Sequence, residues 1–137
     1  MRDYTKLRAF ILSDDLVREV YTLTKRFPKE EIFGLTSQIR RSVIAVPSNI
    51  VEGSYRDSQK EYNRFLEIAF SSLKEAHYQI GLAVKLNFLT KKELDLCESK
   101  FIETEKVLAG LIRKLKTSRG KSGNEIELAQ QPNSPTV

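Results

Sequence analysis

The feature that most constrains the fold is a regular spacing of apolar residues between residues 58 and 86. They follow one another in alternating steps of four and three: Tyr62, Leu66, Ala69, Leu73, Ala76, Ile80 and Ala83. This spacing places them on one face of an α-helix, as in helices that pack in bundles. A second run has similar spacing: Leu94, Cys97, Phe101, Thr104, Leu108, Leu111 and Leu115. The second half of the chain is therefore predicted to form two long amphipathic helices.

Both of these helices have start signals. Ser58 is followed three residues later by Glu61, and Thr90 is followed three residues later by Glu93. In such a capping box the hydroxyl and the carboxylate each accept a hydrogen bond from a free backbone N–H of the first turn. The first of the two helices is predicted to end near Asn87.

Two further helices are predicted in the first half of the chain. One runs from about Ala9 to Arg26 and ends before Pro28, because the residue before a proline avoids the α region. The other runs from about Leu35 to Tyr55. Since short links join the four helices, we predict an all-α, antiparallel up-down four-helix bundle over residues 1–119. Residues 120–137 are rich in Gly, Ser, Asn, Gln and Pro, which predicts a disordered C-terminal tail.

The predicted second helix contains a proline in its interior. Pro47 removes a backbone hydrogen bond and clashes with the carbonyl of Val43, at a cost of about 3 kcal/mol. We therefore predict a kink, with nearby polar side chains helping to satisfy the freed carbonyl: Ser48, Asn49 and Glu52. Gly53 can end the helix or allow another backbone to approach closely. Two interpretations stay open, a structural tie at the end of a kinked helix and a polar interaction point at an oligomer seam or ligand groove.

The same region carries a family resemblance. Its blocks are FPKEE at 27–31, FGLTSQIRR at 33–41, VPSNIVEG at 46–53 and SQKEYNRFLEIAFSSL at 58–73. Together they resemble the bacterial four-helix-bundle proteins encoded in 23S rRNA intervening sequences, over about Phe10 to Leu115. The chain is also similar, more distantly, to the accessory variability determinant proteins of diversity-generating retroelements.

This resemblance implies an antiparallel four-helix subunit that assembles into a homopentamer and has no known catalytic activity. In the retroelement relatives the pentamer is basic and binds nucleic acid and a reverse transcriptase. RNA, DNA and, for a retroelement-linked gene, a reverse transcriptase are therefore the partners to expect. Apolar residues outside the two seams, such as Phe65, Ile68 and Tyr78, exceed what one subunit needs, and they independently predict self-association.

Basic residues gather in two parts of the sequence, and the net charge is +5. A first strip is predicted to follow the second helix into the third: Arg40, Arg41, Arg56, Lys60 and Arg64. A second cluster lies at the end of the fourth helix: Arg113, Lys114, Lys116 and Arg119. Five subunits of net charge +5 would carry +25, enough for salt-sensitive phosphate binding. Alternatively, these cations serve solubility and the helix dipole, in a protein–protein interaction module with no nucleic-acid role.

The sequence offers no catalytic, cofactor-binding or metal-binding motif. His77 is the single histidine and Cys97 the single cysteine, so a His/Cys metal cluster cannot be built. Cys97 lies on an apolar helix face and is predicted to be buried and inert. No apolar run reaches the roughly 18 residues that span a membrane. We therefore expect a non-enzymatic cytoplasmic protein without cofactor or membrane contact.

Overall fold

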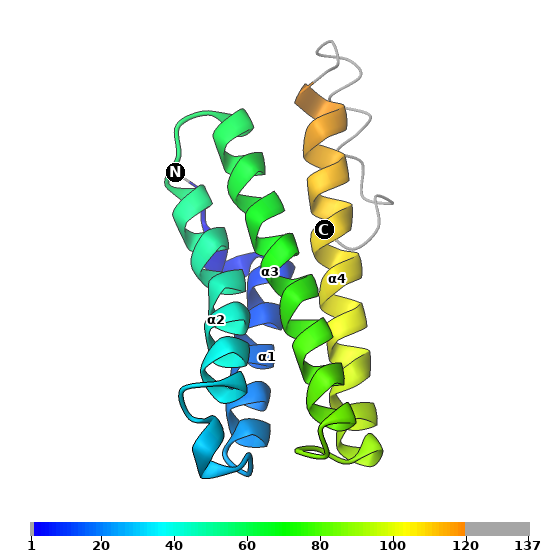
Figure 1. Cartoon of the computed structure of the whole chain (residues 1–137). Helices are drawn as coiled ribbons and strands as arrows, with labels where there is room; N and C mark the ends of the chain where they lie inside the picture. Colours follow the sequence, from blue (N-terminus) through cyan, green and yellow to red (C-terminus); the bar gives the residue numbers. More distant parts are fainter. Residues whose placement is uncertain (1, 120–137) are drawn as a thin grey trace.

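The computed structural model describes residues 2–119, apart from the side chain of Arg119. Two short 3-10 helices, η1 (Tyr4–Lys6) and η2 (Lys29–Glu31), accompany four long helices: α1 (Arg8–Thr24), α2 (Leu35–Ser54), α3 (Gln59–Lys85) and α4 (Lys91–Arg119). No strand occurs among the described residues, so the predicted all-α four-helix fold is confirmed. Each helix begins at the end of the bundle where the previous one stops, so successive helices run in opposite directions (Figure 1). The predicted tail at 120–137 lies outside the described residues.

The predicted seams form the core. All seven seam residues of α3 are buried, from Tyr62 at 6% exposed to Ala83 at 0%. On α4 the central seam residues are buried, whereas Leu94 and Leu115 at its two ends are half-buried. Side chains of α1 and α2 complete the core: Leu16, Val20, Ile39, Val43, Val46 and Ile50. Because burial of one such aliphatic side chain contributes about 1.5–3 kcal/mol, this shared core holds the four helices together.

The two predicted capping boxes differ in the structure. At the start of α4 the box is complete, because the Glu93 N–H donates to the Thr90 hydroxyl (3.1 Å) and the Thr90 N–H donates to the Glu93 carboxylate (2.8 Å). At the start of α3 the Glu61 N–H donates to the Ser58 hydroxyl (3.0 Å). The Glu61 carboxylate instead lies 3.7 Å from the guanidinium of Arg64. An exposed ion pair has thus replaced half of this box.

The α2 helix is continuous from Leu35 to Ser54, with Pro47 inside it. The Asn49 side-chain amide donates to the carbonyl of Ala45 (2.7 Å), one turn back, and not to that of Val43 as predicted. The reason is spacing, since a short amide on a helix reaches the carbonyl four residues earlier. The predicted kink stays a prediction.

At Gly53 the α2 backbone lies close against α3. A Cβ atom at this position would lie 2.9 Å from the Cβ of Phe65 and 3.2 Å from Cδ1 of Tyr62. Real Cβ atoms essentially never show the first of these distances. The sequence-based expectation that Gly53 permits a close backbone approach is therefore met.

Ion pairs on the surface join α1 to α4. They are Arg8–Glu103 (2.6 Å), Lys100–Asp15 (3.1 Å), Lys100–Glu19 (2.5 Å) and, just beyond the end of α1, Arg26–Glu93. Their partners lie far apart in the sequence, by 95 residues for Arg8 and Glu103. The first and last helices of the bundle are thus fastened to each other by charges as well as by the core.

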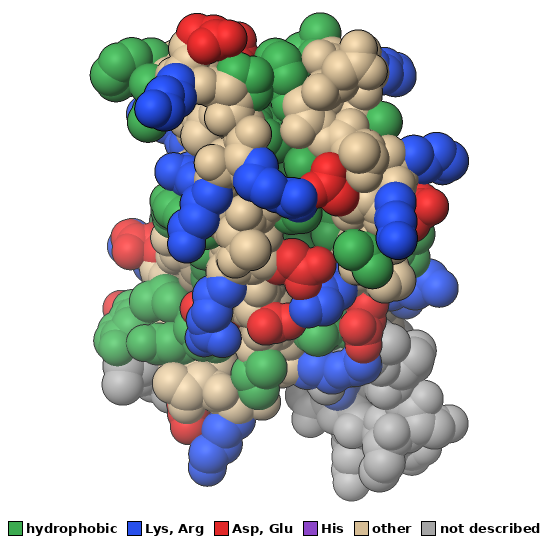
Figure 2. Space-filling model, turned by 90° about the horizontal axis from the view of Figure 1, so that it is seen from below, with side chains coloured by type: hydrophobic (Ala, Val, Ile, Leu, Met, Phe, Trp, Pro, Cys, Tyr) green, Lys and Arg blue, Asp and Glu red, His purple; other side chains and the backbone are tan. Residues whose placement is uncertain are grey.

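Apolar side chains also remain on the surface, including Phe33 at 94% exposed. Seen from below, the end formed by the α1–α2 and α3–α4 connections shows apolar, basic and acidic side chains interspersed (Figure 2). Within the described part of the chain, no helix has the length and apolar character that crossing a membrane requires.

Candidate functional site

The fold brings residues from both predicted basic groups to one end of the bundle. The α2–α3 connection and the last turns of α4 both lie at the upper end in Figure 1. The Gln59 side-chain amide fastens them together by donating to the carbonyl of Leu115 (3.0 Å). We call the cationic residues gathered here the basic end: Arg56, Lys60, Arg64, Arg113, Lys114 and Lys116. Arg119 closes α4 at the same end, but its side chain is not among those described.

Half of the basic end is already paired with acidic side chains. Arg56 pairs with Glu52, Arg64 lies 3.7 Å from Glu61, and Lys116 lies 3.1 Å from Glu67. Within the described residues no ion pair is recorded for Lys60, Arg113 or Lys114. These three cations are the ones most available to a phosphate group.

The other predicted basic residues lie elsewhere. Arg40 and Arg41 are separated from Arg56 by about four turns of α2, or roughly 22 Å. The Arg40 side chain is half-buried, donates from Nε to the Thr24 hydroxyl (2.8 Å) and covers the ring of Tyr21 at 4.5 Å. Arg40 therefore fastens α2 to α1, while Arg41 is exposed. The predicted strip is not continuous in the structure.

The residues of the VPSNIVEG block lie in the C-terminal half of α2, which leads into the basic end. Glu52 forms an i,i+4 ion pair with Arg56 and Gly53 lies against α3. Ser48 is exposed, and Pro47 and Asn49 are half-buried. The Arg2 backbone N–H donates to the Ser54 carbonyl (3.2 Å), so the N-terminal segment also packs here.

Sequence reasoning missed the contribution of the N-terminal segment to the basic end. The Arg2 guanidinium donates to the Arg56 carbonyl (2.9 Å) and covers the ring of Tyr62 at 4.2 Å. A polar hollow of about 490 Å³ lies beside it, lined by Arg2, Tyr55, Arg56 and Asp57. Tyr55 is 58% exposed, which adds an aromatic surface next to the cations. Because Arg2 is 54 residues from Arg56, no local sequence signal could have placed it here.

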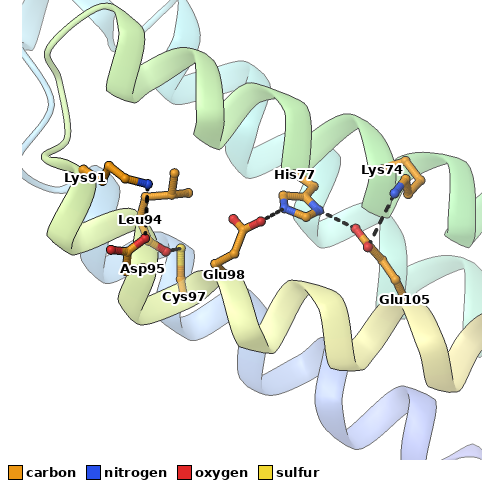
Figure 3. Close-up of polar contacts among 8 residues, drawn as sticks. All are labelled: Lys74, His77, Lys91, Leu94, Asp95, Cys97, Glu98 and Glu105. Atoms are coloured by element: carbon orange, nitrogen blue, oxygen red, sulfur yellow. Dashed lines mark hydrogen bonds and ion pairs between the residues drawn. The ribbon is translucent and has the colours of Figure 1, made fainter.

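A second polar cluster joins the middle of α3 to α4 and was also missed. His77 lies between two carboxylates of α4, with Nδ1 2.5 Å from Glu105 and Nε2 2.9 Å from Glu98 (Figure 3). Its ring stacks on Phe101 at 4.8 Å, and Lys74 reaches Glu105 at 3.4 Å. Burial alone would lower the pKa of His77, but the hydrogen bonds to Glu105 and Glu98 outweigh burial and raise this pKa above its ordinary value.

The His77 cluster has the properties of a connection between two helices. Both ring nitrogens already face carboxylate oxygens, so neither is open to a substrate or a metal ion. In the described part of the chain no group of three or more His, Cys, Asp or Glu side chains is placed to hold a metal ion. Cys97 is fully buried, and burial followed by the nearby Glu19 and Glu98 raises its thiol pKa to about 11. Such a thiol is a poor nucleophile at neutral pH.

Comparison with known proteins identifies a family. The family model of the 23S rRNA-intervening sequence protein matches residues 5–110. It covers the first three long helices and most of α4, and it ends before the α4 residues of the basic end. No curated protein matches the chain.

Proposed function

Because the chain belongs to the family of 23S rRNA-intervening sequence proteins, we propose that it is a non-enzymatic, oligomeric helical scaffold that binds the backbone of structured RNA or DNA through its basic end. The observation that carries this proposal is the meeting of two sequence-distant basic groups at one end of the bundle. Binding would be directed to phosphates, because the cations there are presented by helix ends and turns.

Electrostatics supports a salt-sensitive interaction. Lys60, Arg113 and Lys114 form no ion pair with an acidic side chain of the described residues, so a phosphate need not displace an existing partner from them. Each phosphate that is neutralised releases condensed counterions, which makes affinity fall steeply with salt. The exposed Tyr55 beside Arg2 and Arg56 offers a stacking surface for an unpaired base.

The proposed oligomer is a homopentamer. Large apolar side chains remain exposed on all four long helices: Ile11, Ile44, Ile68, Tyr78, Leu96 and Ile102. Burying such side chains between subunits would be favourable. Five subunits of net charge +5 would then present +25 on one particle, and several basic ends could contact one nucleic acid at once.

The test is a binding titration with a structured 23S rRNA fragment at about 50 mM and about 200 mM salt. The variant K60Q/R113Q/K114Q removes the three cations without acidic partners. A matched control, K25Q/K29Q/K92Q, removes three exposed cations from the α1–α2 connection and the start of α4, which lie at the opposite end of the bundle (Figure 1). We expect the first variant to bind at least tenfold more weakly at the lower salt, with a salt dependence reduced by about two to three counterions.

The control variant distinguishes binding at the basic end from binding that depends only on the net charge of the protein. If both variants lose affinity equally, the interaction depends on overall charge and the basic end is not the site. If the wild-type protein fails to bind at the lower salt, the nucleic-acid function is excluded. Sedimentation of the wild-type protein in the same buffers tests the oligomer, and a monomer at micromolar concentration would contradict the proposed pentamer.

One observation favours a second candidate function. Arg56, Arg64 and Lys116 are already paired with acids, as expected of cations that serve solubility and helix stability. In this alternative the protein is a protein–protein interaction module with no nucleic-acid role. Its partner would be a reverse transcriptase if the gene is linked to a retroelement. Absence of RNA binding combined with a stable oligomer would support this alternative.

A further inference from the structure

A groove runs between α3 and α4 near the basic end. It has a volume of about 450 Å³ and a largely apolar floor formed by Phe70, Ala109 and Ile112. Its charged lining residues are Glu67, Arg113 and Lys116. The three floor residues are only half-buried, so the bundle leaves an apolar surface open beside two cations. A segment that fits this groove needs apolar side chains flanked by carboxylates.

The chain itself contains such a segment. Residues 125–128 read Glu-Ile-Glu-Leu, and Glu125 and Glu127 are the only acidic residues in 120–137. In an extended conformation Ile126 and Leu128 would point to one side and the two carboxylates to the other. We propose that the groove binds Glu125–Leu128 of the same chain, with the apolar side chains on its floor and the carboxylates toward Arg113 and Lys116.

The length of the chain beyond α4 permits this contact. α4 ends at Arg119, and Ile112 lies seven residues, or about 10 Å, back along its axis. The five residues 120–124 can span up to about 17 Å when extended. They read Gly-Lys-Ser-Gly-Asn, a composition that favours a reversal of chain direction. The segment can therefore return to the groove without any change in α4.

Tethering favours the chain's own segment over a second copy of the protein. A segment joined to its site by a short stretch of the same chain has a local concentration in the millimolar range, far above a typical micromolar protein concentration. Lys116 already pairs with Glu67 at 3.1 Å, but both side chains are about half exposed. Exchanging such a partner for Glu127 costs little, because exposed ion pairs contribute little.

Docking of the segment would also affect the proposed nucleic-acid binding. Only this effect, and not the docking itself, depends on the proposed function. Arg113 and Lys116 belong to the basic end, so a docked segment would neutralise part of the surface offered to nucleic acid. Both residues lie beyond residue 110, where the family match ends. The regulation would thus belong to this chain's own C-terminal region.

The contact can be tested in the full-length protein by paramagnetic broadening. An A129C substitution places a single reactive thiol next to the segment, because Cys97 is buried with a pKa raised to about 11. A nitroxide attached there is expected to broaden the methyl signals of Ala109 and Ile112 at least twofold. The methyl signals of Ile32 are expected to stay sharp, because this residue belongs to the α1–α2 connection at the opposite end of the bundle (Figure 1).

Charge variants identify the interaction. E125K/E127K is expected to lower the ratio of bound to free segment about tenfold, and adding R113E/K116E is expected to restore it by exchanging the charges. Q130K/Q131K adds positive charge just outside the segment and is expected to leave the broadening unchanged. All the tail substitutions lie outside the bundle, so the helical fold is retained.

Three results would overturn the proposal. The first is that the methyl signals of Ala109 and Ile112 stay sharp in the nitroxide-labelled protein. The second is that the broadening persists in E125K/E127K. The third is that adding R113E/K116E to E125K/E127K does not restore the broadening. Broadening of an isotope-labelled chain by a nitroxide on a co-expressed second chain would assign the groove to a neighbouring copy instead. RNA binding is not part of this readout, so the two proposals can fail separately.

Discussion

Replacing Gly53 by alanine probes the close contact between α2 and α3. The added Cβ would lie 2.9 Å from the Cβ of Phe65, 3.2 Å from Cδ1 of Tyr62 and 3.3 Å from the Tyr62 carbonyl oxygen. Ordinary contacts between carbon atoms are about 3.5–4.0 Å. A Cβ and a carbonyl move only with the helix that carries them, so α3 must shift. Such overpacking costs about 1–3 kcal/mol.

Two opposing effects set the size of the change. Alanine favours a helix over glycine by up to about 1 kcal/mol, and less at Gly53 because it lies in the last turn of α2. We therefore expect a net loss of about 1–2 kcal/mol of unfolding free energy. For a chain of this length the loss corresponds to a Tm lower by roughly 3–8 °C.

Gly81 provides the matched control. It lies inside α3, and apart from its two chain neighbours and the backbone of the adjoining helix turns no described atom is within 4 Å of a Cβ added there. Gly81→Ala should therefore show the helix preference alone, as a gain of about 0.5–1 kcal/mol. The assay is thermal unfolding followed by circular dichroism at one protein concentration, because assembly would change Tm. A Gly53→Ala protein at least as stable as wild type would refute the close-contact argument.

Three further predictions concern polar groups. The folded-state pKa of His77 is raised above its ordinary value of about 6.5. Protonation of His77 therefore stabilises the folded protein. This stabilisation is complete below about pH 6.5 and is lost as the pH rises through the raised pKa. Urea unfolding should therefore show that His77→Gln lowers the free energy of unfolding more at about pH 5.5 than at about pH 8.5. An equal loss at both pH values would contradict the pairing of protonated His77 with Glu105 and Glu98. Cys97 should resist a thiol reagent at about pH 8 in the folded protein and react after unfolding, because its thiol is buried with a pKa of about 11; fast reaction in the native state would show that α4 opens. Thr90→Ala should lower stability by about 1 kcal/mol, because the Glu93 N–H loses its acceptor; urea unfolding with no change would mean that this cap contributes nothing.

Local spacing was enough to predict most of the fold. The 4-3 pattern from Tyr62 to Ala83 selected the buried face of α3, because helical geometry alone decides which residues share a face. The Thr90–Glu93 box was predictable for the same reason, since both partners lie in one turn. The Ser58–Glu61 box was predicted only in part, because Arg64 lies one turn further on and pairs with the carboxylate.

The candidate sites depend on contacts that no local pattern contains. His77 is 21 residues from Glu98 and 28 from Glu105, so their meeting follows from the register of α3 against α4. The packing of Arg40 against Tyr21 and Thr24 likewise required the position of α1. Charge patterns in the sequence identified which residues are cationic, and the packing decided which of them share a surface.

The ion pairs between α1 and α4 have a consequence for the order in which the subunit opens. They join residues up to 95 positions apart, the largest separation among the ion pairs of the described residues, so this seam is expected to close late in folding. The side chains of Arg8, Glu103, Lys100 and Asp15 are about half exposed. Dissolved salt weakens the attraction between exposed charges. Higher ionic strength should therefore release α1 from α4 before the α2–α3 hairpin separates, and amide exchange along α1 would report that release.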